Sequence, residues 1–117
     1  MDKNSSSPVT FGYDFKVIVK DGFHSGGGSY VLSRESFRRL GQKLSETSGL
    51  SCPNSGTEDV DVAKCLRQLN VRPAKSLDEL GRERFHPLNI HNHYKGRFPG
   101  WLSGYASNPV QMVRFFF

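Results

Sequence analysis

The 117-residue sequence lacks the features that identify membrane proteins and the common nucleic-acid-binding modules. It contains no run of about 20 apolar residues, the length that crosses a bilayer, and no apolar core of a signal peptide. No run of Lys or Arg exceeds two residues, so the net charge of +5 is expected to lie on a solvated surface. Neither an RNP-type nor a helix-turn-helix pattern occurs, and an RNA- or anion-binding module is supported by charge and aromatic residues alone. We expect no nucleic-acid partner and no membrane anchor in this chain.

Motifs for metal and phosphate binding are also missing. No CxxC pair is present for zinc, and the triple glycine at 26–28 has neither the Walker A nor the GxGxxG pattern. It is compatible with a flexible hairpin loop and with a backbone surface open to a ligand. His91 and His93 have no carboxylate or cysteine at ligand spacing, so we predict no metal site. The two cysteines, Cys52 and Cys65, leave a disulfide and a pair of reduced thiols equally open.

The most informative stretch is the one from Ser51 to Asn70, where a turn-rich loop leads into a predicted helix. Thr57 is expected to cap this helix with its hydroxyl, and Pro73 is expected to stop it. Glu58 and Asp59 fall in the first turn, where the helix dipole favours ionised carboxylates. Such a carboxylate beside a Gly/Ser-rich loop can act as a general base, although acidic residues at this position also simply stabilise a helix. The buried stripe is expected to consist of Val62, Leu66 and Leu69.

The rest of the chain predicts short elements. The expected elements are a linker over 1–10, a strand buried on both faces over 15–19, a strand over 30–32, a helix over 33–45 that Ser33 caps, and one helical turn over 77–80. Phe37, Leu40 and Leu44 are expected on the inner face of the helix over 33–45. Residues 85–105 contain Pro and Gly that argue against long regular elements, and we expect an extended segment. The aromatic side chains there, Trp101 included, can stack on a sugar or a base or pack over a small core. His24 and His86 are expected to be hydrogen-bonded structural histidines.

Four sequence segments occur in a characteristic order: FKVIVKDGFHSGGGSYVLSRESFRRL, then TEDVDVAKCLRQLNV within a Cys-x12-Cys frame, then RERFHPL, then HYKGRFPGW. The combination resembles the core 1 β1,3-galactosyltransferases, which are fringe-like β1,3-glycosyltransferases of the secretory pathway. The resemblance runs from about Phe11 to Trp101. Within it, residues 25–33 match the family's Ser-Gly-Gly-x-Gly/Ser-Tyr-Val-Leu-Ser segment, and residues 58–60 match its Glu-Asp-Val/Leu element. Cys52 and Cys65 coincide with the family's cysteine pair, which favours the disulfide.

The resemblance implies a fold class and a reaction. The fold would be α/β, part of a Rossmann-like GT-A glycosyltransferase domain with short strands and two main helices. The reaction would be an inverting transfer of galactose from UDP-galactose to O3 of a GalNAc on Ser or Thr. Asp59, or less favourably Glu58, would be the base that deprotonates the acceptor hydroxyl. The substrate-binding residues implied are Gly26, Gly27 and Gly28 where donor and acceptor meet, Tyr30 behind them, and Trp101 on the acceptor side.

Parts of the family pattern have no counterpart in this sequence. The family's Asp-x-Asp motif for Mn2+ lies upstream of the matching region and a further metal-binding His lies downstream, so we expect no metal ligands in this chain. Asp59 and Asp61 have the Asp-x-Asp spacing but occur at a helix start. We therefore expect a C-terminal-half fragment, with catalytic-domain residues over 11–107 and a divergent tail over 108–117, that is inactive alone. The full-length family member would be a type II membrane protein of the Golgi lumen, with a homodimer as a further expectation. A non-catalytic, chaperone-like relative is the alternative function.

Overall fold

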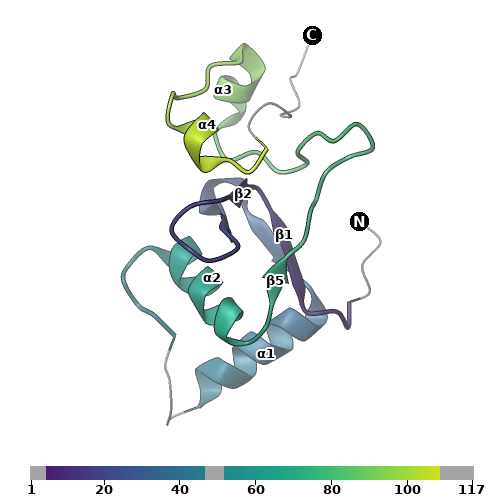
Figure 1. Ribbon diagram of the computed structural model, residues 1–117, viewed down its shortest axis with the longest axis vertical. Helices are drawn as coiled ribbons and strands as arrows, with labels where there is room; N and C mark the ends of the chain where they lie inside the picture. The colour runs from purple at the N-terminus through teal and green to yellow at the C-terminus, as the bar shows by residue number, and fades with distance from the viewer. Residues whose placement is uncertain (1–4, 47–51, 109–117) are drawn as a thin grey trace.

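The fold is built on a three-stranded mixed sheet in the computed structural model, which describes residues 5–46 and 52–108 (Figure 1). The central strand β1 (Val9–Gly12) runs antiparallel to β4 (Tyr30–Leu32) and parallel to β5 (Arg72–Pro73). These strands and the helices that accompany them confirm the α/β class. The assignment to the GT-A fold stays a prediction.

The remaining elements surround this sheet. They are β2 (Asp14–Phe15), β3 (Phe23–His24), the short turn η1 (Gly26–Gly28) and the helices α1 (Arg34–Ser45), α2 (Glu58–Gln68), α3 (Ile90–Lys95) and α4 (Leu102–Tyr105). Strands β2 and β3 pair with each other in a second small antiparallel sheet. In Figure 1, α3 and α4 lie together at the end of the molecule opposite α1, and α2 lies between these ends. No helix of the described ranges 5–46 and 52–108 has the length and hydropathy needed to span a bilayer.

The central strand β1 begins inside the segment that we expected to be a linker. Val9 and Thr10 belong to this strand, and Thr10 is buried because it has a strand on each side. The expected linker therefore ends before Val9 in the structure. Residues 1–4 of that linker, and residues 109–117 of the expected tail, lie outside the described residues.

The strand expected over 15–19 is wrong beyond Phe15. The chain reverses direction after β2, and Ile18 has a positive φ of 71° and an exposed side chain. Arg67 of α2 holds this reversal, because its guanidinium donates to the carbonyl oxygens of Lys20 at 3.1 Å and Gly22 at 2.8 Å. A long-range partner therefore overrides the β propensity of the Val-Ile-Val run.

The core joins α2 to the short C-terminal helix α4. Its buried members are Tyr13, Phe15, Val19, Phe23, Val60, Ala63, Leu102 and Ala106. The ring of Phe15 lies at the centre of the aromatic contacts, with edge-to-face neighbours at Tyr13, 5.7 Å away, and Phe23, 5.4 Å away. Such edge-to-face pairs stabilise beyond the apolar area that they bury.

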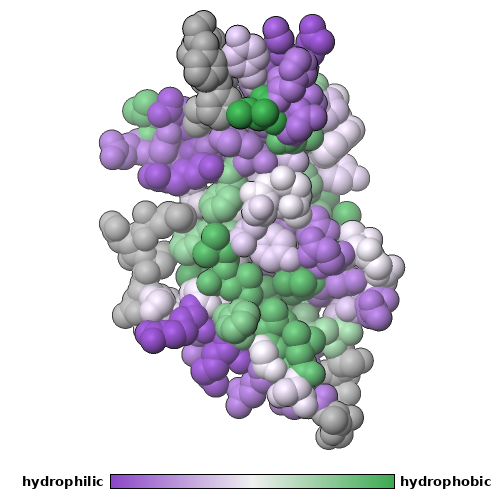
Figure 2. Space-filling view, turned by 180° about the vertical axis from the view of Figure 1, so that it is seen from behind, coloured by the Kyte–Doolittle hydropathy of each residue, from purple (hydrophilic) through white to green (hydrophobic). Residues whose placement is uncertain are grey.

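Helix α1 begins as predicted but packs differently. Ser33 accepts a hydrogen bond from the Ser36 amide at 3.2 Å, which confirms the cap. The expected inner face is wrong, because Phe37 is 70% exposed and Leu44 is 64% exposed, while Leu40 is half-buried. The buried residue is Ser36, whose hydroxyl donates to the Val9 carbonyl at 2.8 Å and brings the first turn of α1 close to β1. Figure 2 shows apolar side chains gathered over the half of the molecule that contains α1.

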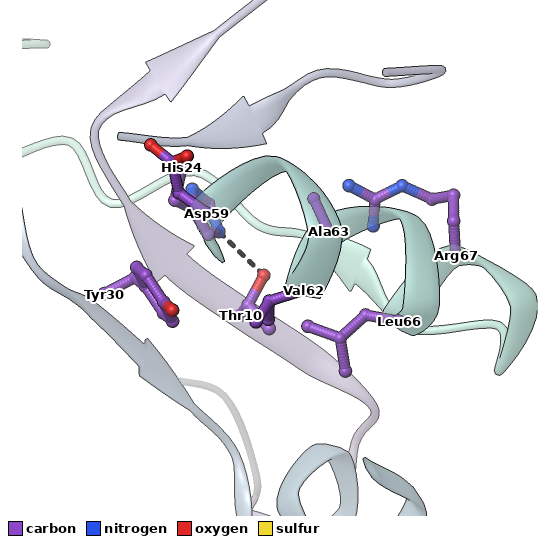
Figure 3. Close-up of a pocket in the computed structure, with 8 residues that line it drawn as sticks. All are labelled: Thr10, His24, Tyr30, Asp59, Val62, Ala63, Leu66 and Arg67. Carbon is purple, nitrogen blue, oxygen red and sulfur yellow. Dashed lines mark hydrogen bonds between the residues drawn. The ribbon is translucent and has the colours of Figure 1, made fainter. Parts of the chain in front are cut away.

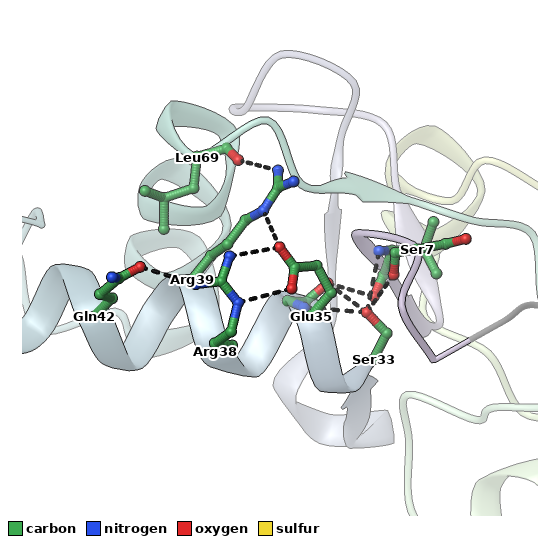
Figure 4. A network of polar contacts seen from close by, with 9 residues as sticks. Ser7, Ser33, Glu35, Arg38, Arg39, Gln42 and Leu69 are labelled. Atoms are coloured by element: carbon green, nitrogen blue, oxygen red, sulfur yellow. Dashed lines mark hydrogen bonds and ion pairs between the residues drawn. The ribbon is translucent and has the colours of Figure 1, made fainter.

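Arg39 belongs to a cluster of ion pairs on α1 and connects this helix to the end of α2 (Figure 4). Glu35 accepts hydrogen bonds from Arg38 at 2.7 and 2.8 Å and from Arg39 at 2.9 Å. These bonds lower the pKa of Glu35 to about 2, so its carboxylate stays ionised. Arg39 also donates to the carbonyl of Leu69 at 2.8 Å, just beyond the last turn of α2. No local sequence pattern indicated this connection.

Helix α2 starts where the sequence predicted, but Thr57 makes no side-chain cap. The buried residues of the helix include Val60, Ala63 and Leu66, which face the core beside β3. The predicted stripe is therefore right at Leu66 and wrong at Val62 and Leu69, which are half-buried.

The ends of α2 are fixed by a disulfide and by a left-handed residue. Cys52 and Cys65 form the predicted disulfide, with their Cα atoms 5.0 Å apart, and it connects the preceding loop to the helix. The helix ends at Gln68, because Asn70 takes a positive φ of 58°. Pro73 lies beyond this end, in the edge strand β5, where its missing N–H costs no hydrogen bond of the sheet.

The helical turn expected over 77–80 is wrong. Asp78 accepts the backbone N–H groups of Leu80 at 2.9 Å and Arg82 at 2.8 Å, and this local bonding competes with a helix. Leu77 and Glu83 instead face each other in an isolated antiparallel bridge. The extended segment expected over 85–105 is also wrong, since it contains α3 and α4. Both helices are short, as the Pro and Gly residues predicted.

Candidate functional site

The two motifs that sequence analysis singled out lie against each other in the structure. The backbone N–H of Gly26 donates to Oδ2 of Asp59 at 3.0 Å. The hydroxyl of Tyr30 donates to Oε2 of Glu58 at 2.6 Å. The glycine turn thus contacts one carboxylate of the α2 start, and the strand that follows the turn contacts the other.

Close packing surrounds the three glycines on two sides of η1. A Cβ at Gly26 would lie 2.8 Å from Oε1 of Glu58, a distance that side chains do not normally adopt. A Cβ at Gly27 would overlap the carbonyl oxygen of Pro87, and one at Gly28 would lie 3.1 Å from that of His86. The turn is therefore enclosed between the start of α2 and residues 86–87, which differs from a flexible hairpin loop. Whether a ligand approaches its backbone stays a prediction.

The two carboxylates differ in their surroundings. Asp59 is half-buried, and its second oxygen, Oδ1, accepts the N–H of Val60 at 2.9 Å. Glu58 is exposed and is held by Tyr30. Both are in the first turn of α2, where the helix dipole stabilises negative charge. An oriented, half-buried carboxylate with a fixed backbone donor is suited to accept a proton from a hydroxyl group.

Tyr30 acts as a hydrogen-bond donor in this arrangement. Burial and its bond to Glu58 raise the pKa of Tyr30 to about 12. The phenol therefore stays protonated at neutral pH and keeps its proton available for the Glu58 carboxylate. Sequence analysis placed Tyr30 behind the glycines, and the structure adds this contact with Glu58.

A small pocket lies beneath Asp59 (Figure 3). It is lined by Thr10, His24, Tyr30, Asp59, Val62, Ala63, Leu66 and Arg67. Its volume of about 10 Å³ is close to that of a single water-sized sphere. A sugar bound to Asp59 would therefore contact the outer surface of the site, and this pocket would lie behind the carboxylate.

His24 forms a polar chain on the far side of this pocket. Its Nε2 lies 2.7 Å from Oγ1 of Thr10, and its Nδ1 lies 2.6 Å from Oδ1 of Asp14. The imidazole is buried, and a Cβ at Gly12 would lie 2.7 Å from it. The expectation of a structural histidine is confirmed for His24. Its partners come from neighbouring strands, and no local sequence pattern indicated them.

Trp101 is the predicted site residue that the structure places elsewhere. Its ring contacts Phe15 at 6.1 Å and Tyr105 at 5.3 Å between centroids, at the start of α4. Half of its surface is exposed. Its role toward an acceptor therefore stays a prediction, and these contacts support the core-packing alternative.

The rings of His86 and His93 pack against each other at a tilt, with centroids 4.7 Å apart. Burial lowers the pKa of both, so both are neutral at physiological pH. His93 accepts the N–H of Leu88 on Nε2 at 3.2 Å and lies in helix α3. Within the described residues, no three His, Cys, Asp or Glu side chains come together as a metal site. These residues thus do not fit a Mn2+ ion, and its involvement stays a prediction.

Comparison with known proteins supports the motif assignment. No protein-family model matches the chain. The chain is 33% identical over 110 residues to glycoprotein-N-acetylgalactosamine 3-beta-galactosyltransferase 1 of Xenopus laevis. The match covers 91% of this chain and 30% of that protein. It confirms the resemblance that the motifs predicted: the chain is similar in sequence to this galactosyltransferase, and it spans about a third of that protein's length.

Proposed function

We propose that this chain is the part of a β1,3-galactosyltransferase that carries the catalytic base. The enzyme would transfer galactose from UDP-galactose to O3 of a GalNAc on Ser or Thr of a glycoprotein. The observation that carries the proposal is the hydrogen bond between the Gly26 amide and Asp59, because it orients a half-buried carboxylate against the backbone of the glycine turn. The name of the Xenopus relative supports the same donor sugar and acceptor.

The proposed step is a single displacement with inversion. Asp59 accepts the proton of the acceptor O3 hydroxyl as that oxygen attacks the anomeric carbon of galactose. The bond from this carbon to the diphosphate oxygen breaks, and UDP leaves with the electron pair. Glu58 accepts a hydrogen bond from Tyr30, so its proposed role is to fix the start of α2 and to add negative potential near Asp59. No step is assigned to a metal ion on the described residues.

The test is a chimera of the Xenopus relative in which this chain replaces the matching segment. We expect it to transfer galactose from UDP-galactose to a GalNAc-peptide in the presence of Mn2+. Asp59→Asn should lower kcat by a factor of about 100 to 10,000, the usual contribution of a general base. Glu79→Gln, in an exposed turn, is the matched control and should leave kcat unchanged. The isolated chain should show no transfer.

Two results would contradict the proposal. If the chimera transfers galactose equally well with Asp59→Asn, Asp59 is not the catalytic base. A folded chimera that binds UDP-galactose but is silent would favour the chaperone-like alternative. Co-expression with the intact relative, followed by measurement of that enzyme's yield, would then test the alternative directly.

A further inference from the structure

A larger cavity lies apart from the pocket beneath Asp59. Its volume is about 400 Å³, and it is lined by Asp14, Lys75, Leu77, Leu80, Gly81, Glu83, Ser107 and Asn108. It has no lining residue in common with the pocket beneath Asp59. The volume lies within the range of about 300 to 1,000 Å³ typical of small-molecule sites. This cavity is therefore large enough for one sugar ring.

The walls of the cavity come from three distant parts of the chain that are bonded together. The amide of Ser107 donates to the carbonyl of Asp14 at 2.9 Å. Asn108 donates through Nδ2 to the carbonyl of Gly81 at 3.0 Å. The bridge between Leu77 and Glu83 closes the third wall. The cavity is thus formed by paired backbone segments that hold its shape.

Glu83 is the residue that points to a ligand. It is only 3% exposed, it lines the cavity, and within the described residues its carboxyl makes no hydrogen bond or ion pair. Burial and the nearby Asp14 raise the pKa of Glu83 to about 7. A buried carboxyl without a partner is costly, and native proteins usually provide a partner or bind one.

The other lining groups define which ligand fits. Asp14 is anchored by its ion pair with His24, and Lys75 makes no ion pair with either acid in the part of the chain that the structure describes. Two carboxyls disfavour an anion, and the Lys75 ammonium disfavours a metal cation. Leu77 and Leu80 add apolar surface. A neutral molecule with several hydroxyl groups and one apolar C–H face satisfies all of these groups.

We propose that this cavity binds one neutral sugar ring, as a carbohydrate subsite separate from the carboxylates of α2. The hydroxyl groups of the sugar donate to Glu83 and Asp14 and accept from Lys75 and Asn108. Its C–H face lies on the two leucines. The subsite follows from the lining residues of the cavity and does not depend on the role proposed for Asp59.

The test is an NMR titration of the 15N-labelled 117-residue chain with galactose, N-acetylgalactosamine and glucose, and with glycerol as a non-cyclic control. We expect saturable shifts of the Leu77, Gly81 and Asn108 amides with at least one sugar. Glu83→Leu should weaken binding about tenfold, the effect of losing one hydrogen bond to a buried carboxyl group. Lys75→Met, on an exposed side chain, should weaken it several-fold without affecting folding. Asp59→Asn should leave the sugar affinity of the cavity unchanged, which distinguishes this site from the site of the proposed transfer.

Three outcomes would overturn the subsite. The first is the absence of saturable shifts with all three sugars. The second is binding that keeps its affinity in both Glu83→Leu and Lys75→Met. The third is a titration with Ca2+ alone that saturates the same amides while the sugars do not, because the cavity would then be a cation site.

Discussion

Glu83 makes the stability of this protein depend on pH in an unusual direction. Its pKa is raised from 4.5 to about 7, mainly because the buried carboxyl is removed from water and secondly because Asp14 lies near. In the unfolded chain the same carboxyl ionises near its ordinary value. As the pH rises from about 4.5 to 7, the unfolded chain therefore loses its proton first and is stabilised relative to the folded protein. The free energy of unfolding should fall over this range, then level off above pH 7.

The size of the effect follows from the pKa difference. At about 1.4 kcal/mol for each unit of pKa, a change from 4.5 to about 7 corresponds to a loss of about 3.5 kcal/mol as an upper limit. Glu83→Gln removes the ionisable group and keeps the shape. The variant should therefore gain about 1 to 3 kcal/mol relative to the wild type between pH 4.5 and pH 7.5.

Urea denaturation at several pH values measures this difference. Unfolding can be followed by the fluorescence of Trp101, the one tryptophan of the chain, and by circular dichroism. Glu79→Gln is the matched control, because it removes an acidic residue that lies four positions before Glu83 in an exposed turn. The reasoning is refuted if the difference between Glu83→Gln and wild type stays constant within about 0.5 kcal/mol across this pH range, the spread usual for surface substitutions.

Two further predictions concern packing and the disulfide. Gly27→Ala should destabilise the protein by about 1 to 3 kcal/mol, because its Cβ would overlap the backbone carbonyl oxygen of Pro87, whereas Gly41→Ala has open space and should stabilise α1 by about 0.5 to 1 kcal/mol. Thermal unfolding of both variants measures this, and equal shifts would contradict the packing account. Replacing Cys52 and Cys65 together by Ser should cost about 3 kcal/mol for this short loop, measured by urea denaturation beside the wild type with and without reductant. The reduced wild type should lose as much stability as the double variant. If neither loses stability, the stabilising role of the disulfide is contradicted.

The features that sequence analysis predicted correctly depend on neighbours in the chain or on motifs. The Ser33 cap requires an amide three residues away, and the motif resemblance anticipated the Cys52–Cys65 pair. The glycine turn and the carboxylates of α2 were singled out separately as candidate site residues. Their hydrogen bond links residues 33 positions apart, so only the structure reveals it.

The features that were missed depend on partners far along the chain. Arg67 bends the segment after Phe15 through carbonyl groups more than 40 positions away, so the Val-Ile-Val run could not form its strand. Phe37 is exposed because the small Ser36 makes the close contact with β1. The cavity at Glu83 combines residues from positions 14, 75–83 and 107–108, and no local pattern marks such a set.

The arrangement of the mixed sheet has a consequence for synthesis of the chain. Strand β1 is made first, but its parallel partner Arg72 follows more than 60 residues after Val9. At about 5 to 20 residues per second, the ribosome needs roughly 3 to 12 s to make that partner. During this time the β5 side of β1 is an open edge, which is a template for pairing with other chains. The central strand is thus the first strand of the sheet to be synthesised and the last to have both of its partners. A chaperone that recognises extended segments could bind β1 during that interval.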